Sequence, residues 1–298
     1  MKFRTEITIK DAPRNLSPER LVLLMGSCFS DYMGEKMEKT GWKSLSNPCG
    51  VVYNPVSMAV LFQLALTHRA LRRDIIEASI TGRESKYASW LMGSIAVADD
   101  KITCIDKVCE AIDRLEEGLE TADALILTFG TPDVWLLKGT DRSVGNCHKH
   151  PASEFEKRRL SIDEIAETWE SLIQVVRDRN PELKVIVTVS PRRYLSEGFE
   201  DNSRQKAILL LACEKLCRNR NSNDKNPKNI TYFPSYEILN DDLRDYRFYA
   251  KDLLHPSEQA VEYIWEKFTE AYLSDSELDK LRKLEKETKR RLHRPQIP

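Results

Sequence analysis

The stretch Leu21-Val-Leu-Leu-Met-Gly-Ser-Cys-Phe29 decides how the rest of the chain is arranged. Its run of apolar residues up to Met25 is typical of a strand buried on both faces of a parallel sheet. Gly26 then allows a sharp turn, and Ser27 stands where the strand gives way to a helix. Open α/β sheets bind ligands beyond the carboxyl ends of their strands, so a serine at this point is placed for chemistry. The alternative is that Ser27 only caps the following helix, a position that serine favours.

A nucleophile for acyl transfer needs an exposed hydroxyl and a nearby amide that stabilises the oxyanion. At the start of a helix Ser27 can offer both. Its neighbour Cys28 is expected to point the other way, into the protein, as a buried side chain. We therefore expect Ser27, and not Cys28, to carry any such chemistry.

Composition limits the classes of function. The chain has 298 residues, of which 41% are hydrophobic and 31% charged, with a formal net charge of -1. This length supports one large core, and the balanced charge gives no reason to expect binding to nucleic acid or an anionic membrane. No apolar run reaches the length of about 18 residues that suggests a membrane helix, and the N-terminus lacks the apolar segment of a signal peptide. The lack of such a run predicts that the protein does not insert into a membrane. Seven cysteines without regular spacing indicate reduced thiols, which predicts a cytoplasmic protein.

Apolar strands alternate with amphipathic helices along the chain. A cap at Asn54 before Pro55 predicts a helix start, and Ser161 with Glu164 forms a capping box. The repeated β–α order predicts a doubly wound, mostly parallel sheet. Strands are expected at 21–26, 124–130, 184–190 and 230–233, with an edge strand at 3–9, and further helices at about 29–39, 106–119, 203–218 and 258–273.

The domain organisation follows from this pattern. Residues 1–273 are expected to form a single domain. Within it, 68–105 is a possible lid or insertion, and Tyr87 to Val97 reads as a strand pair or as part of that lid. Residues 274–298 are predicted to be a charged helical extension surrounded by solvent, with contact to an anionic surface as the alternative.

Asp252-Leu-Leu-His255, just before the last helix of the domain, carries the second chemical signal. An Asp three residues before a His can accept the imidazole Nδ1–H, which leaves Nε2 to take a proton from a hydroxyl. Such pairs also recur where they only tie a loop. Because Ser27 and Asp252-x-x-His255 belong to the first and last α/β units, we expect them to meet at one edge of the sheet.

At this point the sequence resembles the GSCFA-domain proteins of the SGNH/GDSL hydrolase superfamily. The resemblance covers nearly the whole chain. It lies in Gly26-Ser-Cys-Phe29, Asn47-Pro-Cys-Gly-Val-Val-Tyr-Asn-Pro55, Gly130-Thr-Pro-Asp-Val-Trp135, Asn146-Cys-His-Lys149, Thr188-Val-Ser-Pro191, Tyr232-Phe-Pro-Ser-Tyr236 and Asp252-Leu-Leu-His-Pro-Ser257. It implies a flavodoxin-like three-layer α/β/α sandwich with a mostly parallel central sheet, and a triad of Ser27 as nucleophile, His255 as base and acid, and Asp252 as its orienter.

The resemblance also implies an oxyanion hole, built from the amides of Ser27 and Gly50 and a third donor. In the superfamily the third donor is an asparagine, but here Pro132 stands in its place, and proline has no donor. Thr131 is the favoured substitute, with Asn54 and Asn146 as alternatives. The histidine that the family usually carries at about 87–94 is also missing from this chain.

The leading hypothesis is thus a serine esterase acting on O-acyl groups, in particular O-acetyl groups of a carbohydrate. His148, Trp135 and Tyr53 are expected to bind the substrate, and no cofactor is expected. Cys147-His-Lys-His150 lacks a second cysteine or a carboxylate pair at zinc spacing, so no metal is expected either. The alternatives are a non-catalytic carbohydrate-binding or scaffold protein, and an O-acyltransferase with the same triad. The oligomeric state stays open.

Overall fold

Five parallel strands form the central sheet of the computed structural model, which describes residues 5–9, 12–218 and 230–292. Their order is β10–β9–β5–β1–β2. The first strand lies between the second and the third, as in flavodoxin-like sheets, so the predicted fold class is confirmed. The strands are β1 (Val22–Gly26), β2 (Ser44–Ser46), β5 (Ala124–Phe129), β9 (Lys184–Val189) and β10 (Ile230–Tyr232).

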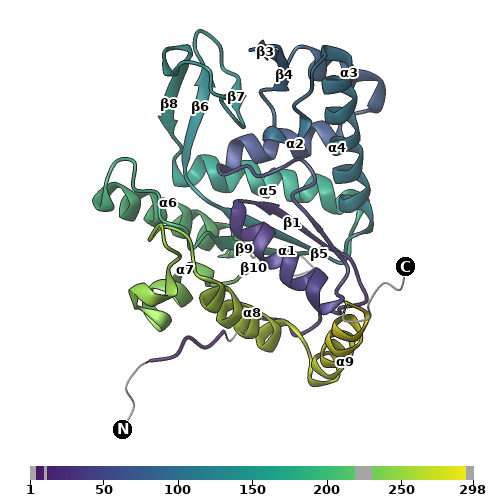
Figure 1. Ribbon diagram of the computed structural model, residues 1–298, viewed down its shortest axis with the longest axis vertical. Coiled ribbons are helices and arrows are strands. Elements are labelled where there is room, and N and C mark those ends of the chain that lie inside the picture. The colour runs from purple at the N-terminus through teal and green to yellow at the C-terminus, as the bar shows by residue number, and fades with distance from the viewer. Residues whose placement is uncertain (1–4, 10–11, 219–229, 293–298) are drawn as a thin grey trace.

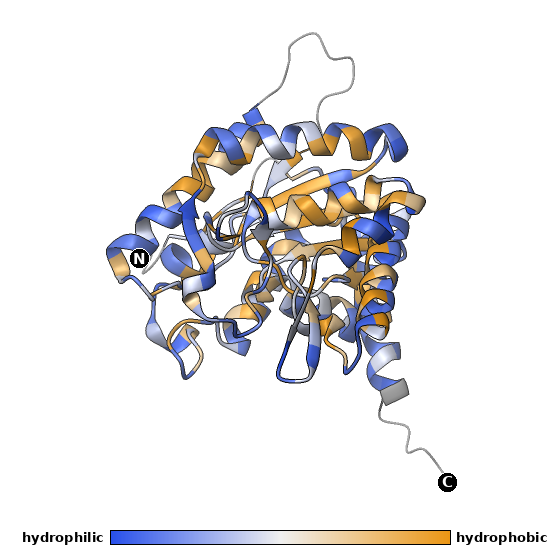
Figure 2. Ribbon diagram, turned by 90° about the horizontal axis from the view of Figure 1, so that it is seen from above, coloured by the Kyte–Doolittle hydropathy of each residue, from blue (hydrophilic) through white to orange (hydrophobic). Residues whose placement is uncertain are grey.

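Helices cover both faces of this sheet, as Figure 1 shows. Side chains of β1 point alternately to the two faces of the sheet. Val22 and Leu24 pack in the buried cluster on one face, and Leu23 and Met25 pack in the cluster on the other. This explains the unbroken apolar run in the sequence. On the first face lie α1 (Cys28–Thr40) and α8 (Glu258–Tyr272); on the second lie α2 (Pro55–Leu66), α4 (Lys101–Thr121), α5 (Ile162–Arg179) and α6 (Phe199–Arg218). Figure 2 shows hydrophobic strands enclosed by helices whose outer faces are largely hydrophilic.

Local signals set the helix ends. Asn54 caps α2 by accepting from the Ser57 amide, and Ser161 caps α5 in the same way, both as predicted. Two helices begin earlier than expected. Asp100 caps α4, so that helix includes residues 101–105, and α6 begins at Phe199 instead of 203.

Two small β elements lie beside this core. Residues 68–105 contain α3 (Arg69–Glu77), an antiparallel pair of β3 (Ile80–Arg83) with β4 (Lys86–Ser89), and the short helix η1 (Ser94–Ala96). The strand pair therefore lies earlier than the predicted 87–97. A second small sheet has the order β7–β6–β8, from β6 (Asp133–Leu137), β7 (Ser143–Val144) and β8 (Phe155–Arg159). The amide of Gly145 donates to the Trp90 carbonyl at 2.7 Å, which ties the two elements together.

The ends of the chain differ from expectation. No strand forms at 5–9, and Ile7 instead donates its amide to Asp242. The C-terminal helix α9 (Asp275–Leu292) is not simply surrounded by solvent, because it packs along α1 and its Leu281 is only 4% exposed. The polar run 219–229 lies outside the described residues. Within the described ranges, no helix has the length and apolar character to cross a membrane.

Candidate active site

The junction between β1 and α1 depends on Gly26. Its φ is +142°, and a Cβ there would lie 2.2 Å from the carbonyl oxygen of Thr128 on β5. The Gly26 amide donates to Oδ1 of Asn47 at 2.8 Å, and its carbonyl accepts from Val52 at 3.0 Å. These bonds hold the loop 47–55 against the start of α1.

Ser27 is fully buried, with 0% of its surface exposed, so the expectation of an exposed hydroxyl is wrong. Its Oγ accepts from the Phe29 amide at 3.3 Å, and its own amide donates to the Thr128 carbonyl at 3.2 Å. The side chain caps α1, which was the alternative interpretation of this residue.

Cys28 is the first residue of α1 and is partly exposed, which corrects the expectation of a buried thiol. Burial raises the pKa of the thiol, while the positive charge of Arg192 opposes that rise. The guanidinium of Arg192 also lies 5.9 Å from the ring centroid of Tyr53. Cys28, Tyr53 and Arg192 thus form one group beside the helix start.

Asp252 and His255 are in contact, as their spacing predicts. Nδ1 of His255 and Oδ2 of Asp252 lie 2.5 Å apart, while Oδ1 accepts the amides of Leu254 at 2.9 Å and His255 at 3.0 Å. The hydrogen bond from His255 holds the pKa of the Asp252 carboxyl well below its usual range, and the two amides contribute. With Nδ1 engaged, Nε2 is the ring nitrogen available for proton transfer.

The segment carrying this dyad lies next to the loop after β9. The amide of Arg193 donates to the Leu254 carbonyl at 3.0 Å, and Arg193 follows Arg192. Burial raises the pKa of Tyr32 on α1, and negative charge at both Cys28 and Asp252 adds to that rise. The dyad and the start of α1 therefore share one neighbourhood. Among the described residues, however, no hydrogen bond joins His255 to Ser27.

The donors of Ser27, Gly50, Thr131 and Asn54 that were expected in the oxyanion hole already donate to protein acceptors. The Gly50 amide donates to the Asn47 carbonyl at 2.7 Å, and Oγ1 of Thr131 donates to Gln205 at 2.8 Å. The side-chain amide of Asn54 donates to Ser57. Oδ1 of Asn146 accepts from the amide of His148.

The expected substrate-binding residues lie in different places. His148 and Asn146 line a cavity of about 660 Å³ between β3–β4 and the loop 145–150. Nε2 of His148 donates to the Ser89 carbonyl at 2.8 Å, and burial lowers the pKa of the ring. Tyr53 lies near Cys28, whereas Trp135 is 39% exposed on β6.

Arg192 and Lys206 lie near the start of α1, but they were not predicted as site residues from the sequence. Lys206 is 1% exposed and donates to the carbonyls of Gly130 and Ser190, at the carboxyl ends of β5 and β9. Burial, aided by the charge of Arg192, lowers its pKa to about 7. Arg192 could have been found from the sequence because it follows a predicted strand, at the edge of the sheet where ligands bind. For Lys206 the signal is a lysine at the helical spacing of the buried residues Leu209 and Cys213.

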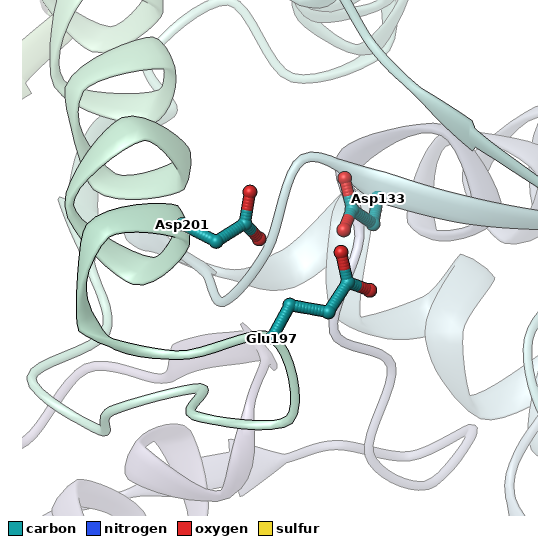
Figure 3. Close-up of side chains that lie close together, drawn as sticks. All are labelled: Asp133, Glu197 and Asp201. Carbon is teal, nitrogen blue, oxygen red and sulfur yellow. The ribbon is translucent and has the colours of Figure 1, made fainter.

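Asp133, Glu197 and Asp201 bring their carboxylates together, as Figure 3 shows, and form the one cluster of this kind within the described part of the chain. Arg159 binds Asp133 at 2.7 Å and Asp201 at 2.8 Å, and Lys157 pairs with Asp133 and Glu197. Two cationic side chains thus occupy the space among the carboxylates. The arrangement is that of a salt-bridge network.

Comparison with known proteins identifies the family: the family model of the GSCFA family matches residues 21–268. The chain belongs to the GSCFA family. No curated protein matches this GSCFA chain.

Solved structures that resemble the chain include a family 3 carbohydrate esterase of Clostridium thermocellum, with 12% identity and a TM-score of 0.36 over 89% of this chain and 98% of that one. A putative GDSL-like lipase from Parabacteroides merdae has 11% identity and a TM-score of 0.41 over 87% and 98%. A family 3 carbohydrate esterase from Talaromyces cellulolyticus has 11% identity and a TM-score of 0.35 over 90% and 99%. TM-scores of this size are too low to carry an activity from one protein to another.

Proposed function

We propose that this GSCFA-family protein hydrolyses esters, with His255 as the general base and acid and Asp252 as the residue that orients it. The observation that carries the proposal is the 2.5 Å contact between Nδ1 of His255 and Oδ2 of Asp252. A carboxylate on Nδ1 sets the tautomer in which Nε2 accepts a proton, and it stabilises the imidazolium that forms. The imidazole is partly exposed, with 24% of its side-chain surface accessible, so a substrate can reach it.

In this reaction the hydroxyl of Ser27 attacks the ester carbonyl while Nε2 of His255 takes its proton. The alcohol leaves with that proton. His255 then deprotonates a water molecule, which hydrolyses the acyl-enzyme. Before it attacks, the Ser27 hydroxyl has to break its hydrogen bond with the Phe29 amide, which caps α1.

The natural esters in this proposal are O-acetyl groups of a carbohydrate. The family resemblance supports this choice. The cavity lined by Asn146 and His148 supports it too, because its walls combine apolar surface with several side chains that can form hydrogen bonds, as a sugar ring with hydroxyl groups requires. The cavity adjoins the loop 47–55, since Ser94 lines it and the neighbouring Gly93 packs against Gly50. An O-acyltransferase would use the same residues and differ only in the acceptor of the acyl group.

One observation favours a non-catalytic carbohydrate-binding protein instead. The amides of Ser27 and Gly50 and the hydroxyl of Thr131 all donate to protein acceptors, so a substrate oxyanion would have to displace those partners. Losing one such donor costs on the order of 10²–10³ in turnover. A protein that only binds carbohydrate has no need of the Asp252–His255 contact, whereas ester hydrolysis uses it. For this reason hydrolysis is the preferred proposal.

The test compares the wild-type protein with His255→Ala in the hydrolysis of p-nitrophenyl acetate and of acetylated xylo-oligosaccharides. His68→Ala is the control, because His68 is an exposed residue that caps α3. We expect His255→Ala to lose at least about 100-fold in kcat/KM, and His68→Ala to keep wild-type activity. Equal activity of wild type and His255→Ala would contradict the proposal. Calorimetric binding of the oligosaccharide without any hydrolysis would favour the binding protein.

A further inference from the structure

We propose that the cavity between the β3–β4 hairpin and the loop 145–150 binds a carbohydrate that carries a carboxylate, and that Arg83 and Lys149 bind this carboxylate. This inference rests on the proposed hydrolysis of carbohydrate esters and names the class of carbohydrate. Three observations support it: the form of the cavity, the fixed groups in its wall, and the cationic side chains that line it.

The cavity lies between two elements that are held together. Its volume of about 660 Å³ is within the range of about 300–1,000 Å³ that is usual for small-ligand sites. Thr81 lines it from β3, and Asn146 and His148 line it from the loop. The hairpin and β7, which the loop follows, lie side by side in Figure 1, and the hydrogen bond from Gly145 to Trp90 joins them. A ligand in the cavity therefore contacts both elements at once.

Two histidines in the wall are fixed by hydrogen bonds and by one aromatic ring. Nε2 of His148 donates to the Ser89 carbonyl at 2.8 Å, and Nδ1 of His150 lies 2.9 Å from Oε2 of Glu154. The ring of Trp90 contacts the His150 ring edge-on, with 4.6 Å between the centroids. Because these groups are held before a ligand arrives, ordering them costs little when it binds.

The loop itself has an unusual backbone. His148 and Lys149 have φ values of +45° and +62°, in a region that residues other than glycine rarely adopt. The His148 amide donates to Oδ1 of Asn146 at 2.8 Å, and the His150 amide donates to the Cys147 carbonyl at 2.8 Å. These bonds hold the strained turn, which places Lys149 in the cavity wall. Strain of this kind is typical of ligand-binding loops.

Cationic side chains line the cavity and keep donors for a ligand. Arg83, Lys86 and Lys149 belong to the lining, and Glu84, with 79% of its side chain exposed, is the one carboxylate among the described residues that line it. Lys86 pairs with Asp99, and Nε of Arg83 lies 3.4 Å from Glu84. Nη1 of Arg83 is buried without a hydrogen-bond partner in the described part of the chain, and Lys149 forms no ion pair there.

A carboxylate suits these two cations. An arginine binds a carboxylate through two parallel N–H donors, and a lysine adds a point charge on a flexible side chain. A buried donor without an acceptor destabilises a protein, and a ligand oxygen bound to Nη1 of Arg83 would remove that cost. A neutral sugar offers hydroxyl groups but no charge to neutralise Arg83 and Lys149. We therefore expect an acidic sugar to bind more tightly than a neutral one.

Calorimetry with the full chain measures the binding of trigalacturonic acid and of its methyl ester, which has the same sugar rings without the negative charges. The variants are Arg83→Gln, Lys149→Gln and the double variant, and Lys283→Gln, at an exposed lysine of α9, is the matched control. We expect the wild type to bind the acid at least about tenfold more tightly than the ester, and about 0.5 M NaCl to remove most of that preference.

Each single variant should lose part of the preference for the acid, and the double variant should bind acid and ester within about twofold of each other. Lys283→Gln should keep the wild-type preference, and Arg83→Lys, which retains the charge, should keep part of it. Equal binding of acid and ester by the wild type, binding of neither, or a preference that both single variants keep in full would overturn the inference.

Binding and hydrolysis distinguish this inference from the proposed function. If the wild type binds trigalacturonic acid through Arg83 and Lys149 but hydrolyses no acetyl ester, the proposed function fails and the inference stands. If it hydrolyses acetylated xylo-oligosaccharides but shows no preference for the acid, the proposed function stands and the inference fails. If both are correct, Lys149→Gln should raise KM for acetylated trigalacturonic acid at least about threefold.

Discussion

Oδ2 of Asp252 lies 2.5 Å from Nδ1 of His255, and Oδ1 of the same carboxylate accepts the backbone amide of His255 at 3.0 Å. The two residues are therefore joined twice within one turn of chain. Backbone amides hold the Asp252 carboxylate in place, and the carboxylate in turn orients the His255 ring. These hydrogen bonds hold the carboxylate against Nδ1 of the imidazole.

Asp252→Asn is expected to lower kcat by about 10²–10⁴-fold and to leave KM nearly unchanged, because an amide at this position favours the wrong tautomer of His255. Since the pKa of Asp252 is well below its usual range, its own titration should not appear in the wild-type rate profile above about pH 4. Steady-state kinetics across pH check both points. Asp279→Asn, which removes an exposed charge on α9, is the control. An unchanged kcat in Asp252→Asn would contradict the role of the dyad.

Lys206→Met is expected to change how stability depends on pH. The pKa of Lys206 is about 7 in the folded protein and about 10.4 in an unfolded chain, so the unfolded state binds more protons between these values. Below about pH 7 the folded protein carries the full free-energy cost of burying the charged Lys206 side chain. The free energy of unfolding of the wild type should therefore rise from about pH 7 to about pH 10. In Lys206→Met this rise should be reduced.

Urea unfolding at a series of pH values measures the effect. Lys101→Met, at an exposed lysine of α4, is the control and should follow the wild-type curve. Lys206→Met should also be less stable at high pH, because the carbonyls of Gly130 and Ser190 lose their donor. Parallel pH curves for Lys206→Met and the wild type would contradict the assignment.

Gly26→Ala is expected to destabilise the fold by more than about 3 kcal/mol, because the new Cβ would lie 2.2 Å from the Thr128 carbonyl oxygen and push β1 away from β5. Gly139→Ala is the matched comparison. Gly139 also has a positive φ, of +74°, but no atom lies within 4 Å of its added Cβ, so only about 1 kcal/mol of backbone strain is expected. Denaturant unfolding of both variants tests the contrast, and similar losses would mean that the contact with β5 is unimportant.

Leu281→Ala tests whether α9 belongs to the folded core. The side chain is 4% exposed within the cluster that includes α1, so its loss should cost about 2–3 kcal/mol. Lys283→Ala, on the exposed face of the same helix, should change stability by less than about 0.5 kcal/mol. A loss in Leu281→Ala as small as that in Lys283→Ala would mean that α9 is the solvated extension expected from its charge.

Much of the fold could be predicted because its causes are local in the chain. The apolar run before Gly26 made β1 a buried strand, and caps such as Asn54 and Ser161 set helix starts within a residue or two. The contact between Asp252 and His255 was predictable for the same reason, since three residues of chain bring the two side chains together. The strand predicted at 3–9 does not form over the described residues 5–9, because a strand needs a neighbouring strand and these residues pair with none.

The sequence by itself determined the order of β1, β5, β9 and β10 with the helices between them, the family, and the Asp252–His255 contact, because each depends on neighbouring residues or on apolar periodicity. Only the tertiary structure decided that Ser27 is fully buried and Cys28 partly exposed. The two residues are adjacent at a helix start, and the direction of each side chain depends on the backbone at Gly26, which the close approach of Thr128 on β5 constrains. Tertiary packing likewise brought Arg192 and Lys206 to this junction from a separate loop and helix. Such long-range contacts leave no local pattern in the sequence, and for this reason they could not be predicted from it.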